Sequence, residues 1–209
     1  MGLLTGQVPA GWPERPLGEV CELVAGPRTD RNAPDGTESW PVPVVGPKDL
    51  RHNRIARNCT TTVPEHVAHR LSRYRLHPDD IVVARTGQPD HQGLATPEQY
   101  GWLFSSACLR LRVVDGAVSP RYLAQYLGHP AVRDWIVRNT GGSIMPTLTT
   151  KLLGALPVAV PPEDVQAGVA DVLGALDEKA MVHEEISRTT AELHDALRLR
   201  LLADNPINW

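Results

Sequence analysis

The sequence lacks the signals of secreted, disulfide-linked and membrane proteins. Its three cysteines, Cys21, Cys59 and Cys108, are an odd number at wide spacings, which is typical of reduced thiols. No apolar run approaches the ~20 residues that a membrane span requires, and the N-terminus has no charged region followed by an apolar core. We therefore expect a cytoplasmic protein without disulfides or membrane spans.

Motifs for catalysis, cofactors and metals are also missing. The sequence contains no G-x-S-x-G, no G-x-x-x-x-G-K-[ST] and no G-x-G-x-x-G, so hydrolase, nucleotide and dinucleotide chemistry lack their usual signals. Cys59, His66 and His69 are the one arrangement that suggests a metal, but their spacing matches no standard zinc pattern and no fourth ligand is evident. The sequence thus predicts no catalytic residue, no cofactor and no metal.

Proline is absent for about forty residues after Pro161 and Pro162, which predicts a long helix there. At ~1.5 Å per residue such a helix is a rod of roughly 60 Å, longer than one small domain is wide. Gly168 and Gly174 each cost about 1 kcal/mol relative to alanine, so we expect a break or bend near Gly174. Apolar residues recur along the helix at alternating steps of four and three, the spacing of a coiled-coil seam. The seam residues that we assign to dimerisation are Val169, Val172, Leu176, Ile186, Leu193 and Leu197.

Charge is divided between the two ends of the chain. Residues 1–162 carry 17 Lys and Arg against 14 Asp and Glu, whereas residues 163–209 carry 4 against 10. Phosphates would repel the acidic end, which therefore suits a protein partner, while the front suits DNA. We accordingly predict a DNA-binding domain at 1–162 and a dimerisation helix at 163–209. An amphipathic helix that packs only on its own domain is the alternative.

Positive charge in the front part is concentrated in one stretch of sequence. Between Lys48 and Arg75 there are seven Lys and Arg against two acidic residues. Arginine can grip a phosphate or a guanine edge with two hydrogen bonds, so this stretch is the first candidate for DNA contact. A solvated charged face is the alternative. The candidate residues are Lys48, Arg51, Arg54, Arg57, Arg70, Arg73 and Arg75.

Two further segments are candidates for contact with DNA. The turn Arg85-Thr86-Gly87 follows an apolar strand at Ile81–Ala84, where a recognition loop would emerge. Ser143, next to two glycines, and Lys151 suit phosphate binding. A simple turn and ordinary packing are the respective alternatives. Strands are also expected at 20–24, 42–45, 109–114 and 156–160, and an interrupted helix at 119–140, which together predict an α+β fold.

Several segments in the same order resemble a known family. They are LGEVCELVAG (17–26), PVVGPKDL (43–50), HPDDIVVARTG (77–87), SSACLRLRV (105–113), SPRYLAQYLGHPAVRDWI (119–136) and LGALPVAVPPEDVQAGVADVLGALDEKAMVHEEI (153–186). This pattern resembles a target-recognition domain and its spacer helix in specificity (S) subunits of type I restriction-modification systems. It departs from the family after Gly87, where Gln88-Pro89-Asp90-His91 replaces the usual continuation.

The resemblance implies a module that reads double-stranded DNA and carries no chemistry of its own. It would direct an adenine methyltransferase subunit, and often a nuclease-translocase (restriction) subunit, to a DNA sequence. Family members usually carry two recognition domains and two spacer helices, whereas 209 residues hold one of each, so a homodimer of half-subunits would rebuild the whole. The alternative is a scaffold protein that keeps the fold but has lost DNA reading.

Overall fold

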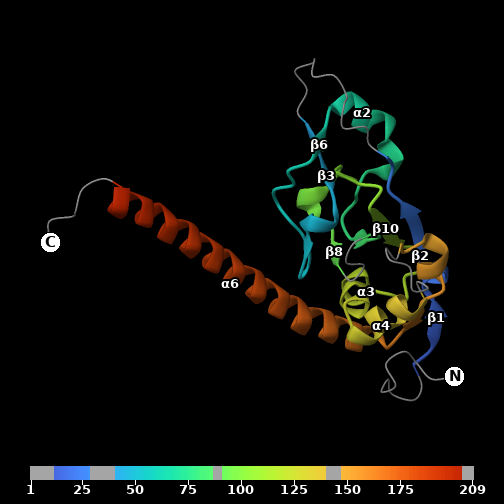
Figure 1. Ribbon diagram of the computed structural model, residues 1–209. Helices are drawn as coiled ribbons and strands as arrows, with labels where there is room; N and C mark the ends of the chain where they lie inside the picture. Colours follow the sequence, from blue (N-terminus) through green and yellow to red (C-terminus); the bar gives the residue numbers. More distant parts are fainter. Residues whose placement is uncertain (1–11, 29–40, 87–90, 140–146, 204–209) are drawn as a thin grey trace.

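The computed structural model describes residues 12–28, 41–86, 91–139 and 147–203. These residues form a mixed α/β domain from which one long helix, α6 (Glu163–Ala203), projects to one side (Figure 1). The predicted fold class, a sheet-containing domain followed by a long C-terminal helix, is confirmed. Among the described residues, no helix has both the length and the apolar character of a membrane span.

A six-stranded sheet forms the centre of the domain. All neighbouring strands are antiparallel except β5 and β8, which run parallel. Strands predicted at 42–45 and 81–84 have these bounds, whereas β4, β5 and β8 were not predicted. In spatial order the six strands are β2 (Cys21–Ala25), β10 (Cys108–Val113), β7 (Ile81–Ala84), β8 (Gln92–Leu94), β5 (Asn53–Ile55) and β4 (Leu50–Arg51).

Two smaller sheets complete the strands. β3 (Val42–Val45) lies between β6 (Thr62–Val63) and β9 (Leu103–Phe104), and the helix α2 (Glu65–Arg70) packs beside it. β1 (Glu14–Pro16) pairs with β11 (Pro157–Ala159) just before α6 begins. In Figure 1, α2 and β6 lie at the end of the domain remote from the attachment of α6.

The central sheet is buried on both faces, as the continuous apolar run in β7 predicts. Ile81 and Val83 point into the larger core, whereas Val82 and Ala84 point into a second core, in keeping with the alternation of a strand. The larger core is covered by α1 (Leu17–Val20), α3 (Pro120–Leu127), α4 (Pro130–Asn139) and α5 (Thr150–Gly154). Short 3₁₀ helices at Pro47–Asp49, Ser72–Tyr74 and Pro97–Gln99 connect strands.

An ion pair crosses the buried part of the sheet. Asp80 is 1% exposed and accepts two hydrogen bonds of 2.7 Å from the Arg112 guanidinium and one of 2.8 Å from the His77 amide. The Asp80 carboxylate raises the pKa of Arg112. Asp80 thus ends the turn before β7 and neutralises a β10 arginine at the same time.

The helix α6 is helical throughout, so the break expected near Gly174 does not occur. A Cβ at Gly168 or Gly174 would meet nothing within 4 Å, and neither glycine interrupts the hydrogen-bonded turns. The start of the helix is fixed by Gln166, whose side chain bonds the Ser119 amide at 2.7 Å and the carbonyls of Ala117 and Pro161 at 2.8 and 2.9 Å. From Val182 to Leu202 every residue is exposed.

Candidate nucleic-acid interface

The site begins with a tight hairpin between β4 and β5. Its two loop residues, His52 and Asn53, have φ of 47° and 55°, and the flanking residues Arg51 and Arg54 pair directly. Two consecutive residues with positive φ are typical of a type I′ turn, and asparagine tolerates this conformation better than most residues. The turn carries both loop side chains toward α6.

β8 approaches β5 so closely that glycine is required. A Cβ on Gly93 would lie 2.7 Å from the carbonyl carbon and oxygen of Arg54, closer than real Cβ contacts allow. This approach places Gln92, the residue before Gly93, beneath the hairpin. The short sequence Gln92-Gly93 thus brings a buried amide to the turn.

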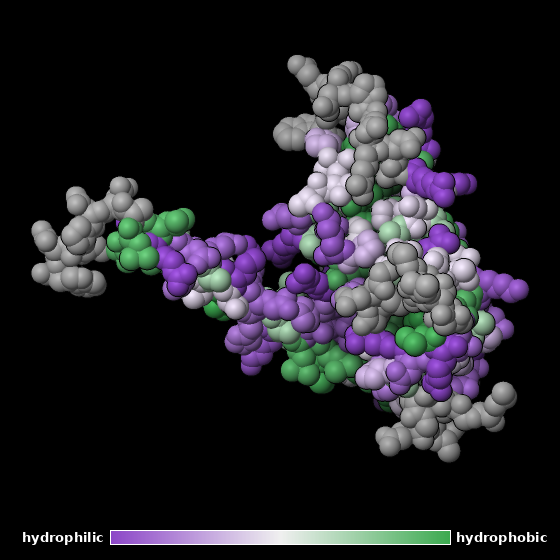
Figure 2. Space-filling view, in the orientation of Figure 1, coloured by the Kyte–Doolittle hydropathy of each residue, from purple (hydrophilic) through white to green (hydrophobic). Residues whose placement is uncertain are grey.

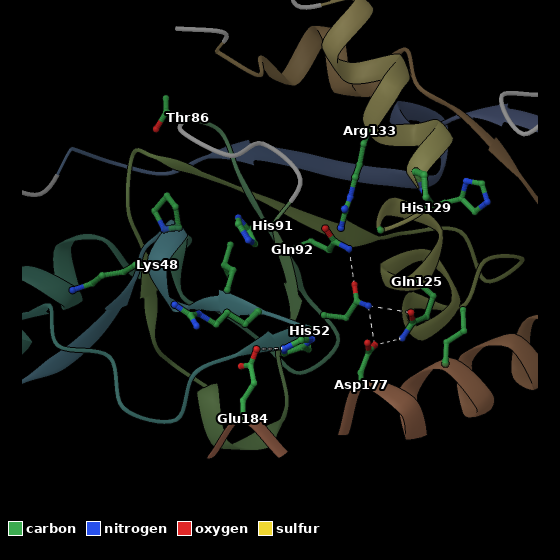
Figure 3. A pocket seen from close by; sticks show the side chains of 17 residues that line it. Lys48, His52, Thr86, His91, Gln92, Gln125, His129, Arg133, Asp177 and Glu184 are labelled. Atoms are coloured by element: carbon green, nitrogen blue, oxygen red, sulfur yellow. Dashed lines mark hydrogen bonds and ion pairs between the residues drawn. The ribbon is translucent and has the colours of Figure 1, made fainter. Parts of the chain in front are cut away.

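Four polar side chains from four elements meet at this point (Figure 3). The Asp177 Oδ2 atom accepts hydrogen bonds from Asn53 Nδ2 at 2.8 Å and Gln125 Nε2 at 2.7 Å. Asn53 Nδ2 also donates to Gln125 Oε1 at 3.0 Å, and Gln92 Nε2 donates to Asn53 Oδ1 at 2.6 Å. We call these four residues the polar network. It links the hairpin, β8 and α3 to α6.

The polar network forms one wall of a cleft of about 750 Å³, which we call the basic cleft. Its other walls come from the β3–β4 connection, the end of β7, the start of β8 and the α3–α4 junction. Figure 3 shows Arg133 and His91 pointing into the space beside Gln92. The charged or titratable residues that line the cleft are Lys48, Arg51, His52, His91, His129, Arg133, Asp177 and Glu184.

Both acidic residues of the basic cleft belong to α6. Glu184 Oε1 lies 2.9 Å from His52 Nε2, and this hydrogen bond, aided by the nearby charge of Arg51, lowers the pKa of Glu184. Asp177 is held in the polar network. The remainder of the cleft offers Lys48, Arg51 and Arg133 as permanent positive charges, an arrangement suited to an anionic backbone.

The predicted residues from Lys48 to Arg57 lie around the hairpin. Lys48 and Arg51 line the basic cleft. Arg54 faces α6, with its guanidinium 3.8 Å from Glu178, and Arg57 lies 3.3 Å from Glu98 outside the cleft. The sequence predicts that the acidic surface of α6 binds a protein partner. Part of this surface pairs instead with the domain of the same chain.

The other predicted arginines of this stretch lie beside α2, away from the basic cleft. Arg70 is exposed in the last turn of α2, and Arg73 stacks on Tyr74, with the guanidinium carbon 4.6 Å from the ring centre. Arg75 pairs with Glu65 at 2.5 Å. The arginine stretch that is continuous in sequence thus divides into two surfaces in space.

The turn after β7 contributes to the basic cleft through one residue. Thr86 lines it, whereas Arg85 turns back and donates from Nε to the Leu148 carbonyl at 3.1 Å. Lys151 is exposed on α5, which packs against α1 and β2 rather than beside the cleft. Gly87 and Ser143 lie outside the described residues.

Five of the six residues of the predicted dimerisation seam are exposed on α6. Val169 packs against the larger core. The other five seam residues are between 46% and 63% exposed, and Figure 2 shows an apolar surface on the part of the helix near the domain. These five are Val172, Leu176, Ile186, Leu193 and Leu197. Ala170 and Asp177 face the domain, and each follows a seam residue, Val169 or Leu176, by one position.

Sequence reasoning did not identify His91, His129, Arg133 or Gln92 as site residues. Arg133 lies on the polar side of a short helix, and the His129 ring accepts a hydrogen bond from the Ala131 amide at 3.1 Å. The one available signal was the Gly128-His129-Pro130 interruption, which marks a loop but not its position in space. Within the described part of the chain, no group of three His, Cys, Asp or Glu side chains is placed to hold a metal.

Solved structures share this arrangement of a mixed-sheet domain and a long helix. The HsdS subunit from Thermoanaerobacter tengcongensis matches with a TM-score of 0.57 at 16% identity, over 86% of this chain and 40% of that chain. The type I restriction-modification S subunit from M. genitalium matches with a TM-score of 0.64 at 15% identity, over 94% of this chain and 47% of that one. The type IIG restriction endonuclease BpuSI matches with a TM-score of 0.58 at 8% identity, over 77% of this chain and 26% of that chain.

These likenesses show the fold, and the chain spans less than half of the length of each of these structures. A search of curated protein sequences gave no significant match. A family model, the type I restriction modification DNA specificity domain, matches residues 9–189. The chain therefore belongs to this family, and the resemblance found in the sequence is confirmed.

Proposed function

We propose that this chain is the sequence-reading subunit of a type I-like restriction-modification system and that it holds DNA in the basic cleft. The observation that carries the proposal is the convergence of Lys48, Arg51, Arg133 and Thr86 from separate segments on one cleft of a specificity-domain protein. Basic residues that neutralise phosphates supply affinity for DNA, and side chains that reach into a DNA groove supply the contacts to bases.

We infer that the two parts of the chain divide the work. Residues 1–162 contact DNA, and residues 163–209, which include α6, assemble with other subunits. The exposed apolar seam supports this division, because its large side chains leave apolar surface in water along a helix of 41 residues. A second copy would cover it through an antiparallel pair of helices, and two recognition domains would then read one site.

The chain supplies recognition and no catalysis in this proposal. An adenine DNA methyltransferase subunit performs methylation, and a restriction subunit cuts where one is present. Two identical domains related by a two-fold axis read identical half-sites in inverted order, so the target is expected to be a split palindrome.

Expression of the chain with its methyltransferase, followed by sequencing for methylated adenine, tests the proposal. We expect methylation at a split palindrome, and none when the chain is omitted. A seven-residue insertion between Arg188 and Thr189 keeps the seam in phase and should lengthen the spacer of that site. Methylation that does not depend on the chain would favour the scaffold alternative, and an asymmetric site would refute the homodimer.

A further inference from the structure

The polar network attaches α6 to the domain at a second point along the helix. The first point is Gln166, which is buried and bonded to three backbone groups. Asp177 follows eleven residues later, a distance of roughly 16 Å along the helix at 1.5 Å per residue. One attachment would let a rod swing about its end, whereas two attachments define its direction.

We propose that Asn53 and Asp177 are positioning residues that set the angle between the recognition domain and α6. Asp177 Oδ2 receives hydrogen bonds from the hairpin and from α3 at 2.8 and 2.7 Å, so one carboxylate oxygen holds three elements together. Hydrogen bonds to an ionised carboxylate are stronger than those between neutral groups. The Asp177 carboxylate therefore holds α6 against the hairpin and α3.

The surrounding contacts across this junction are weaker. Arg121 pairs with Asp171 at 2.9 Å and Arg54 with Glu178 at 3.8 Å, and all four side chains are more than one-third exposed. Exposed ion pairs contribute little because water and salt screen them. Beyond the polar network, the His52–Glu184 contact of 2.9 Å and the packing of Val169 and Ala170 also hold α6 against the domain. The polar network is the one contact at which a single carboxylate oxygen of α6 receives hydrogen bonds from two other elements.

The backbone around the polar network is shaped to hold Asn53 in place. The type I′ turn has two loop residues, so Asn53 has little freedom to move independently of β4 and β5. At the α3–α4 junction, a Cβ on Gly128 would lie 2.6 Å from Gln92 Nε2 and 3.4 Å from Asn53 Oδ1. The missing side chain at Gly128 leaves the space that the two amides occupy.

The same four side chains line the basic cleft. Given the proposed function, DNA in the cleft lies against the residues that set the angle of the helix. The polar network then lies between the DNA and α6, and it sets the direction of α6 relative to the DNA. This consequence rests on the proposed function, whereas the positioning role of Asn53 and Asp177 does not require DNA.

Distance measurements by electron spin resonance, made without DNA, test the positioning role. Spin labels would be placed at His66→Cys on α2 and Asp195→Cys on α6, in a Cys59→Ser background. Cys21 and Cys108 are buried and burial raises the pKa of each thiol to about 12, so neither should be labelled at neutral pH. Excess unlabelled chain removes distances between copies.

The parent protein should give one narrow distance distribution. Asn53→Asp places two carboxylates 2.8 Å apart, so the distribution should broaden or shift. Adding Asp177→Asn should restore it, because the new carboxylate at position 53 then accepts from the amides at 92, 125 and 177. The matched control is Asp171→Asn, which removes an exposed ion pair of the same helix and should leave the distribution unchanged.

Two outcomes would overturn the proposal. One is an unchanged distribution in Asn53→Asp, and the other is a double variant that stays as broad as the single one while its domain melts at the parent temperature. If Asn53→Asp does not fold, Asp177→Ala provides the test from the helix side. A narrow, unshifted distribution in that variant would equally refute the positioning role. Failure of DNA binding would refute the proposed function and leave this result standing.

Discussion

His52 Nε2 lies 2.9 Å from Glu184 Oε1, so the β4–β5 turn contacts α6 about two helical turns beyond Asp177. This is the last contact of the helix with the domain through an ion pair or hydrogen bond among the described residues. Past Glu184, the ion pairs of the helix with other described residues lie within the helix itself, such as Arg188 with Glu192 at 2.8 Å.

The histidine contact should be visible in the titration of Glu184. Because the His52 hydrogen bond lowers the pKa of Glu184, the contact stabilises the fold above the pKa of a glutamate in the unfolded chain and is lost as pH falls through the lowered value. His52→Ala should raise the Glu184 pKa toward the usual range, as measured by carboxyl NMR. Arg54→Ala, whose partner is Glu178, is the control. An unmoved Glu184 pKa in His52→Ala would contradict the assignment.

DNA affinity should depend on the basic cleft more than on the surface beside α2. Lys48→Ala and Arg51→Ala should each weaken binding and lower the slope of log K against log salt by about 1 per lost phosphate contact. Arg70→Ala, the same kind of change on α2, should alter neither. Fluorescence anisotropy at several salt concentrations measures both quantities. A larger effect at Arg70 than at Arg51 would move the interface to the α2 surface.

Self-association should depend on the exposed seam. Ile186 and Leu193 each leave roughly 100 Å² of apolar surface in water, about 2.5 kcal/mol per residue at 25 cal/mol per Å². Changing both to Asp should give monomers in analytical ultracentrifugation. Ala191→Asp adds a charge on another side of the same helix and should leave association intact. A parent chain that stays monomeric at high concentration would refute the dimer.

Removal of the buried Asp80 carboxylate should lower the free energy of unfolding more than removal of an exposed charge. Asp80→Ala removes the carboxylate partner of Arg112, whose side chain is 31% exposed, and leaves the His77 amide without its acceptor. The expected loss is about 1–3 kcal/mol of unfolding free energy. Arg188→Ala breaks exposed pairs only and should cost about 0.5 kcal/mol or less. Urea denaturation compares the two. Equal costs would show that the Asp80 pair contributes no more than a surface one.

The sequence was sufficient to predict elements whose residues carry a strong local pattern. The apolar run Ile81–Ala84 and the helix start after Pro162 were predicted because burial and proline chemistry act on neighbouring residues. By contrast, β5 and β8 are short and partly polar, and their pairing joins residues 40 positions apart in the sequence, Asn53 with Gly93 and Arg54 with Leu94. No local pattern encodes that pairing.

The candidate site was only partly predictable for the same reason. Lys48, Arg51 and Thr86 were identified because basic residues and strand ends can be recognised in sequence. His91 and Arg133 join them only once the sheet and the α3–α4 junction have formed. The composition of α6 indicated an acidic helix, but which carboxylates turn toward the hairpin depends on how the helix packs.

Because α6 is one unbroken helix, a change of its angle at Asp177 is carried along its whole length to Ala203. From Asp177 to Ala203 the helix extends roughly 39 Å at 1.5 Å per residue. A tilt of about 10° at Asp177 would carry the far end through roughly 7 Å, about two base-pair steps of DNA. A small displacement near Asp177 therefore moves the far end of the helix more than an equal displacement near Ala203 does. Substitutions that shift Asn53 or Asp177 by fractions of an ångström should alter the reach of the assembly more than larger changes near its tip.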